Sequence, residues 1–148
     1  MAFLALGACT SESSGKRPPE GPRIALTASA AELYEAYGKA VNTPERGAIA
    51  SFYASDGVVR VLNGTTVRTS RIALDSMYRG RWSPPAHFRW DSLAFDSLSP
   101  TQVLVTGGFR WQAAGSPDTT RWLYAGLLEA ADSGLVIRFE HETMRPGS

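Results

Sequence analysis

The pattern of apolar and polar positions along residues 102–129 predicts a long β-hairpin. Two runs rich in β-branched and aromatic residues flank Gly-Ser-Pro-Asp, a sequence typical of a turn. If the turn is centred between Ser116 and Pro117, residues two apart on each strand share one face. The cross-strand pairs expected on that face are Trp111 with Trp122, Phe109 with Tyr124, Gly107 with Gly126, and Val105 with Leu128.

That face would carry four aromatic rings at one end and two opposed glycines in the middle. Large rings beside missing side chains would make a concave apolar floor, and small ligands usually bind on such floors. Alternatively, helices fill the gap over the glycines and the face belongs to a packed core, because aromatic faces are commonly core. The sequence leaves both interpretations open.

Helical spacing of apolar residues alternates with strand-like runs before this hairpin. The elements expected there are a helix capped by the box Ser29–Glu32, a second helix begun by Thr43–Pro44, a hairpin of Val58–Leu62 and Thr65–Arg68 around Asn63–Gly64, and a third helix capped by Ser70 and ended by Gly80. The first helix places Leu33, Tyr37, Ala40 and Val41 on one side.

Two further strands are expected, at 86–95 and 135–143. In the first, Phe88 and Trp90 have the opposite parity to Leu93 and Phe95, which a bulge near Asp91–Ser92 would reconcile. A turn over 96–100 would set Trp90 opposite Gly107 and Phe88 opposite Phe109. The last strand would carry Leu135, Ile137, Phe139 and His141 on one face, with His141 opposite Trp122.

The expected order of elements is two helices, a short hairpin, a third helix and four long antiparallel strands. This order favours an α+β fold, with helices over one face of a curved sheet. The segments AIASFYASDGVVRVLNG (48–64), LSPTQVLVTGGFRW (98–111) and GLVIRFEHET (134–143) resemble, in order and spacing, the nuclear transport factor 2-like superfamily in its SnoaL-like branch. The resemblance spans roughly residues 28–143. Leu135 stands where a tryptophan is usual in that family.

This resemblance implies a cone-shaped fold, with three N-terminal helices packed on a curved antiparallel sheet around an internal pocket. The superfamily includes isomerases, dehydratases, cyclases, epoxide hydrolases and binding domains, so the fold does not settle the function. The residues expected to line the pocket are Tyr37, Trp90, Phe109, Trp111, Trp122, Tyr124 and His141.

Ketosteroid-isomerase-like chemistry needs a carboxylate base and acidic hydrogen-bond donors at the forming oxyanion. Tyr37 falls where that family carries a helix-1 tyrosine, but the base position falls near Val61 and the second donor near Leu127–Leu128, which are apolar. No complete catalytic set is therefore visible. Because histidine titrates near neutrality, an enzyme of the isomerase, dehydratase or cyclase kind using His141 and Tyr37 is the alternative.

Composition narrows the function classes. The chain has 148 residues and a net charge of +1, without a basic run interleaved with aromatic residues, so nucleic-acid binding is not expected. It has one cysteine and two histidines without metal-ligand spacing. We expect no metal and no cofactor, and one folded domain over residues 24–145.

The first 23 residues differ in character from the rest. Leu6-Gly7-Ala8-Cys9 resembles a bacterial lipobox, although residues 1–9 lack the basic start and longer apolar core of a signal peptide. Residues 10–23 are rich in Ser, Pro and Gly, which is typical of a disordered tether. Together they predict an extracytoplasmic domain, periplasmic or at the cell surface, anchored to a membrane by a lipid on Cys9. A disordered end with an incidental cysteine is the alternative.

The function expected from the sequence is binding of a small apolar or aromatic molecule in the pocket. A structural or partner-binding module, with the pocket filled by its own side chains, is a further alternative. A homodimer is also expected, because the sheet face opposite the aromatic floor is too apolar for free solvent. That face carries Leu104, Thr106, Leu123, Ala125 and Leu127, flanked by Arg110 and Arg121.

Overall fold

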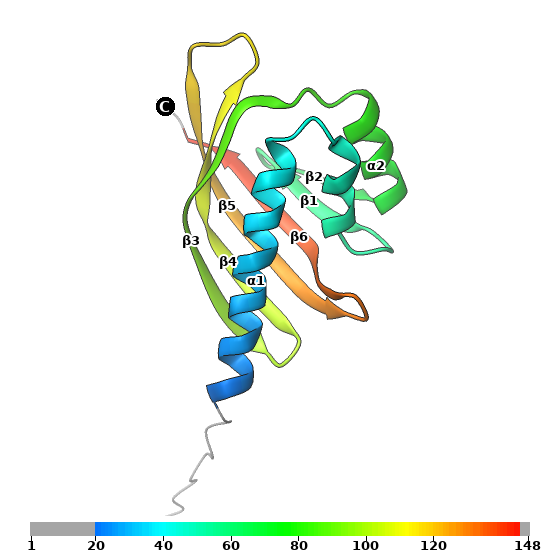
Figure 1. Cartoon of the computed structure of the whole chain (residues 1–148), viewed down its shortest axis with the longest axis vertical. Helices are drawn as coiled ribbons and strands as arrows, with labels where there is room; N and C mark the ends of the chain where they lie inside the picture. The colour runs from blue at the N-terminus through cyan, green and yellow to red at the C-terminus, as the bar shows by residue number, and fades with distance from the viewer. Residues whose placement is uncertain (1–19, 146–148) are drawn as a thin grey trace, which may run out of the picture.

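The computed structural model describes residues 20–145 (Figure 1). The elements are α1 (Glu20–Val41), the 3-10 helix η1 (Arg46–Phe52), β1 (Val58–Leu62), β2 (Thr65–Thr69), α2 (Arg71–Gly80), β3 (Pro85–Ser99), β4 (Gln102–Ala113), β5 (Thr119–Ala131) and β6 (Gly134–Met144). Their order along the chain is the one expected from the sequence. The predicted lipobox with Cys9, and residues 10–19 of the predicted tether, lie outside the described residues.

The six strands form one sheet in the order β2-β1-β6-β5-β4-β3. It is a mixed sheet and not the antiparallel sheet expected, because β1 runs parallel to β6 while the other neighbouring strands are antiparallel. No tight turn joins β1 to β6, so no hairpin imposes an antiparallel direction on this pair. The pairing sets Arg60 beside Glu140 and Leu62 beside Glu142.

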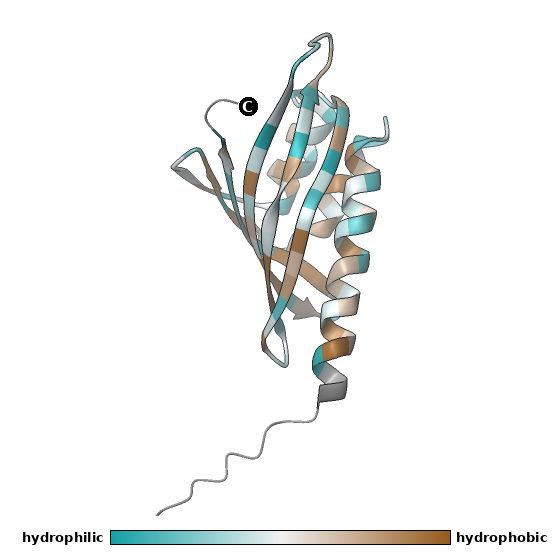
Figure 2. Cartoon of the chain, turned by 90° about the vertical axis from the view of Figure 1, so that its left-hand side faces the viewer, coloured by the Kyte–Doolittle hydropathy of each residue, from teal (hydrophilic) through white to brown (hydrophobic). Residues whose placement is uncertain are grey.

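Helix α1 begins at Glu20, nine residues before the predicted cap at Ser29 and inside the segment expected to be a tether. Alanine and leucine in IALTASAAEL favour helix on both sides of Ser29, so the helix runs through it. Its buried face carries Ala30, Tyr34, Tyr37 and Val41, spaced as one side of a helix requires. In the side view α1 lies along one side of the curved sheet (Figure 2).

The other two helical segments differ from each other. The second is a 3-10 helix of seven residues, where an α-helix was expected, so only two of the three segments are α-helices. It buries Ile49 and Ala50 against the core. The third agrees with its predicted cap, because the Ser70 hydroxyl accepts a hydrogen bond of 3.2 Å from the backbone N–H of Ala73. None of the described helices is long and apolar enough to cross a membrane.

The central hairpin is shifted by two residues from the predicted register. Gly115, at a φ of +79°, lies at the turn, whose centre moves to Gly115–Ser116. The observed pairs are Trp111 with Thr120, Phe109 with Trp122, Gly107 with Tyr124, and Val105 with Gly126. A shift of two keeps every side chain on its predicted face.

Strand β3 is longer than expected and is also shifted. It runs to Ser99, so the turn falls at Pro100–Thr101. Trp90 then pairs with Phe109 and Phe88 with Trp111, instead of with Gly107 and Phe109. The predicted bulge is present, because the register shifts between Asp91 and Ala94, and Ser92 has a φ of +56°.

A second bulge, in β6, was not anticipated. Leu127 pairs with Phe139 but Leu128 pairs with Ile137, so Arg138 is an extra residue. Its guanidinium bonds Glu129 at 2.8 Å and also pairs with Asp56. The extra residue reverses the parity of the strand, so Ile137 and Glu140 both face the core. The prediction that Leu135, Ile137, Phe139 and His141 share a face is therefore wrong from Phe139 onwards.

The predicted gap over the two glycines is filled. A Cβ atom on Gly126 would lie 2.5 Å from the hydroxyl oxygen of Tyr34 and 2.7 Å from that of Tyr124. A Cβ atom on Gly107 would lie 2.6 Å from the Ser92 carbonyl oxygen, at the β3 bulge. At the glycines the packed-core interpretation therefore applies, with α1 supplying Tyr34.

Candidate functional site

A cavity of about 270 Å³ lies between the inner face of the sheet and the helices. Its lining consists of Tyr37, Val41, Arg60, Leu62, Met77, Tyr78, Trp82, Phe88, Trp90, Phe109, Trp111, Trp122 and Glu142. Eight of these thirteen residues are aromatic, and they include all four tryptophans of the chain. Among the lining residues, Leu62 is 46% exposed.

Ring-to-ring contacts hold the aromatic wall in place. Phe109 and Trp122, a cross-strand pair, stack with centroids 5.6 Å apart and planes 5° apart. Trp82 contacts Trp111 edge to face, at 6.0 Å, and Tyr78 in the same manner at 5.2 Å. Each such contact stabilises the arrangement by about 0.5–1.5 kcal/mol beyond simple burial. The wall is therefore preformed.

Five of the seven predicted pocket residues line this cavity: Tyr37, Trp90, Phe109, Trp111 and Trp122. Tyr124 lies outside the lining, buried, with its hydroxyl 2.6 Å from that of Tyr34. His141 pairs with Ala125, not Trp122, and faces the other side of the sheet. Its Nε2 lies 3.1 Å from the Thr143 hydroxyl. The sheet therefore separates His141 from Tyr37.

Sequence reasoning missed two charged residues of the lining, Arg60 and Glu142. The position of a catalytic base was expected near Val61, and the residue that faces the cavity there is Arg60. Glu142 faces the cavity where His141 was expected. A single arginine inside the apolar run VVRVL was a usable signal, because a charged residue in a half-buried strand usually has a partner. No comparable signal existed for Glu142, whose direction depends on the bulge at Arg138.

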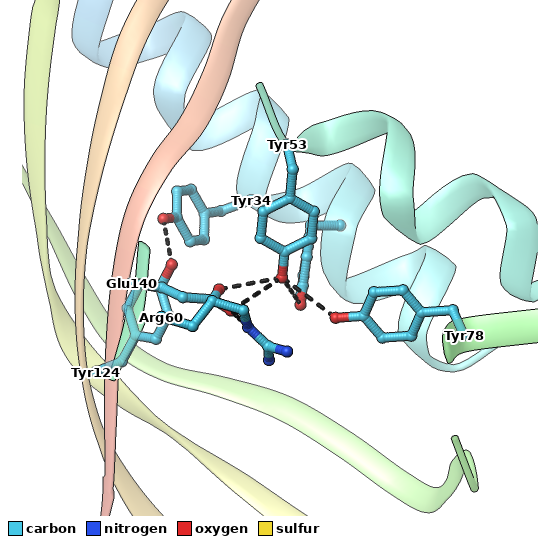
Figure 3. Close-up of polar contacts among 7 residues, drawn as sticks. Tyr34, Tyr53, Arg60, Tyr78, Tyr124 and Glu140 are labelled. Atoms are coloured by element: carbon cyan, nitrogen blue, oxygen red, sulfur yellow. Dashed lines mark hydrogen bonds and ion pairs between the residues drawn. The ribbon is translucent and has the colours of Figure 1, made fainter. Parts of the chain in front are cut away.

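A buried polar cluster lies beside the cavity (Figure 3). Glu140, only 1% exposed, accepts a hydrogen bond from Arg60 Nε and forms an ion pair with it. The Tyr53 hydroxyl donates to Glu140, 3.0 Å from Oε2 and 3.2 Å from Oε1. That hydroxyl also lies 3.0 Å from the hydroxyl of Tyr37 and 3.2 Å from that of Tyr78. Tyr37 and Tyr78 therefore link the cluster to the cavity.

Burial keeps the phenols of this cluster neutral. It raises the pKa of Tyr78 to about 12, with the Glu140 carboxylate adding to the effect. For Tyr37 and Tyr53 burial raises the pKa well above the ordinary value. These hydroxyls therefore keep their protons at physiological pH and serve as hydrogen-bonding groups.

Glu142 differs from Glu140, although both face inward from β6. Burial, and then the charge of Glu140, raise the pKa of Glu142 to about 8, while Arg60 acts in the opposite direction. Within residues 20–145 its carboxyl group forms neither a hydrogen bond nor an ion pair, and it lines the cavity. A carboxyl group of this kind can hold or release a proton near neutral pH.

The described part of the chain contains no group of three or more His, Cys, Asp or Glu side chains arranged to hold a metal ion. The groups that line the cavity are one arginine, one carboxyl group, two phenols and aromatic surface. These groups can bind an apolar molecule, hold a charged group on it, or move a proton.

Comparison with known proteins identifies the architecture. No family model matches this chain, and neither does any curated protein sequence. Among solved structures, a nuclear transport factor 2-like protein of unknown function from Shewanella oneidensis superposes with a TM-score of 0.70 at 18% identity, covering 79% of this chain and 98% of that one. The chain has a nuclear transport factor 2-like fold.

Two other solved structures agree. A nuclear transport factor 2-like protein from Novosphingobium aromaticivorans has a TM-score of 0.65 at 13% identity and covers 84% of this chain and 85% of its own. A hexachlorocyclohexane dehydrochlorinase from Novosphingobium barchaimii has a TM-score of 0.68 at 16% identity, with coverages of 86% and 91%. These identities are too low to carry an activity across, so they establish the fold alone.

Proposed function

We propose that this domain binds a small, largely apolar or aromatic molecule in the cavity. The observation that carries the proposal is the preformed aromatic wall, to which all four tryptophans of the chain contribute. Small-molecule sites are concave and mostly apolar, with a few polar groups that orient the ligand. Arg60 and Glu142 are the orienting groups here.

Calorimetric titration with 2-naphthol, a two-ring probe, tests the proposal. Met77 lines the cavity from α2, so Met77→Trp places a larger side chain in its wall and should weaken binding about tenfold or more. Ile72 lies on the same helix and is 84% exposed, so Ile72→Trp is the matched control and should bind like wild type. Absence of binding to wild type, or equal loss in both variants, would contradict the proposal.

A second candidate function is proton transfer on a bound carbon acid, as in an isomerase or an elimination enzyme. What favours it is the Glu142 carboxyl group, which lines the cavity, forms neither a hydrogen bond nor an ion pair within residues 20–145, and titrates near neutrality. Tyr37 and Tyr78 are neutral phenols that line the same cavity, and either could turn its hydroxyl proton from Tyr53 toward a developing oxyanion.

Solvent hydrogen exchange of 2-tetralone in D₂O, followed by NMR, tests the second function. Wild type should accelerate exchange increasingly up to about pH 8, as Glu142 loses its proton, and Glu142→Gln should abolish the acceleration. Glu32→Gln, which removes an exposed carboxylate of α1, should leave it unchanged. If 2-naphthol binds but exchange matches the buffer rate, only the binding function remains.

We further propose that the domain is extracytoplasmic and held at a membrane by a lipid on Cys9. The support is Leu6-Gly7-Ala8-Cys9 followed by the Ser-, Pro- and Gly-rich segment. Wild type and Cys9→Ser, expressed from the full reading frame, should divide differently between membrane and soluble fractions. Equal distribution of the two proteins would refute the anchor.

A further inference from the structure

When Glu142 is ionised, the charges that face the cavity do not balance. Arg60 and Glu142 are the charged groups of its lining, and Glu140, on the neighbouring strand, is ion-paired with Arg60. The ion pair of Arg60 with Glu140 is neutral as a unit, so an ionised Glu142 leaves the site with one uncompensated negative charge. The other titratable groups of the lining, Tyr37 and Tyr78, remain neutral.

The uncompensated carboxyl group lies in an aromatic enclosure. Tryptophan faces attract cations through the ring quadrupole, and the attraction increases when water is excluded. Trp82 and Trp111 stand edge to face, Phe109 and Trp122 stack, and all four line the same cavity as Glu142. An aromatic enclosure with one carboxylate is the combination that recognises ammonium groups.

We infer that the ligand of this cavity is an organic cation, an ammonium group on a small apolar body, with Glu142 as its counter-ion. This inference rests on the proposed binding function and names its ligand class. An ammonium group would supply the positive charge that balances the Glu142 carboxylate, and the aromatic wall would cover the apolar body of the ligand.

The same geometry disfavours the other two ligand classes. An anion could approach the Arg60 guanidinium, but that group is already ion-paired with Glu140, and Glu142 adds a second carboxyl group on the same neighbouring strand. A neutral apolar molecule would cover Glu142 without giving it a hydrogen bond, and covering an ionised carboxyl group in this way is costly. A cation neutralises the charge of the carboxylate and makes it a favourable contact.

The test compares benzyltrimethylammonium, whose charge does not vary with pH, with its uncharged isostere neopentylbenzene, by calorimetry on the full chain. At about pH 9, where Glu142 is ionised, the cation should bind about tenfold or more tightly than the isostere. At about pH 6, where Glu142 holds a proton, the affinity for the cation should fall about tenfold or more, while the affinity for the isostere should not fall.

Glu142→Gln keeps the shape of the side chain and removes its charge. It should weaken the binding of the cation about tenfold and flatten the pH profile, while Glu32→Gln, an exposed carboxylate of α1, should change neither. A loss of the near-ultraviolet circular dichroism signal would show that Glu142→Gln is not folded. In that case the test is the ratio of the wild-type affinities for the cation and for the isostere, measured as a function of pH.

Other binding results would overturn the inference, the proposed function or both. Equal affinity for cation and isostere, or tighter binding of phenylacetate than of the cation, overturns the inference; the second result would favour Arg60 as the recognition group. If 2-naphthol binds and benzyltrimethylammonium does not, the inference falls and the proposed aromatic binding stands. If none of these probes binds, the proposed function fails as well.

Discussion

The hydroxyl oxygens of Tyr34 and Tyr124 lie 2.6 Å apart, above the backbone of Gly126. Tyr34 comes from α1 and Tyr124 from β5, so this hydrogen bond joins the helix to the centre of the sheet. Burial raises the pKa of both phenols above their ordinary value, so the pair keeps its protons. Gly126 is required beneath it, because any side chain there would enter the space of the two oxygens.

Gly126→Ala should therefore destabilise the protein by about 1–3 kcal/mol, the usual cost of overpacking. The new methyl group would lie 2.5 Å from the Tyr34 hydroxyl, too close unless the tyrosine moves. Gly80→Ala is the control, because nothing lies within 4 Å of a Cβ atom there. Urea denaturation measures both changes. A Gly126→Ala protein as stable as wild type would show that the helix is not seated on the glycine.

Arg60→Met tests the buried ion pair. Glu140 would retain only the Tyr53 hydroxyl, and an uncompensated buried carboxylate is costly. We expect a loss of about 3 kcal/mol, at the low end for such pairs because the Arg60 side chain is 23% exposed. Adding Glu140→Gln to Arg60→Met should recover part of it, since the unpaired charge is removed. A double variant less stable than Arg60→Met would refute this account.

The pH dependence of stability should report Glu142. Its pKa is 4.5 in the unfolded chain and about 8 in the folded protein, so between these values the folded state binds the additional proton. Stability from this group is therefore fully present below about pH 4.5 and is lost as the pH rises through about 8. Urea denaturation at several pH values should show this fall in wild type and not in Glu142→Gln. Parallel curves for the two proteins would contradict it.

The faces of the central hairpin could be predicted from the sequence, and its register could not. Parity alone sets Phe109, Trp111 and Trp122 on the inner face, and a shift of two residues leaves parity unchanged. The turn sequence Gly-Ser-Pro-Asp, however, permits two centres, and the left-handed Gly115 selects the earlier one. The aromatic wall was thus correctly assigned while its cross-strand partners were not.

The polar side chain that β6 contributes to the cavity could not be predicted from the alternation of residues along the strand, because that alternation is interrupted at Arg138. The bulge at Arg138 exchanges the two faces of the following residues, so Glu142 reaches the cavity and His141 leaves it. Arg138 is an extra residue that pairs with Glu129 and Asp56, from two different parts of the chain. These ion pairs form only in the folded structure, and no local pattern in GLVIRFEHET predicts them.

We propose that two copies of the chain form a homodimer through the outer face of the sheet. Leu123 on β5 is 44% exposed, and the face that it shares with Leu104 and Leu127 is apolar, so a second copy would remove this surface from water. Sedimentation of residues 20–148 at tens of micromolar should give a dimer, and Leu123→Glu should give a monomer. Ile72→Glu is the matched control, since Ile72 is more exposed but lies on α2, away from that face. A monomeric wild type would refute the dimer, and equal dissociation by both substitutions would place its interface elsewhere.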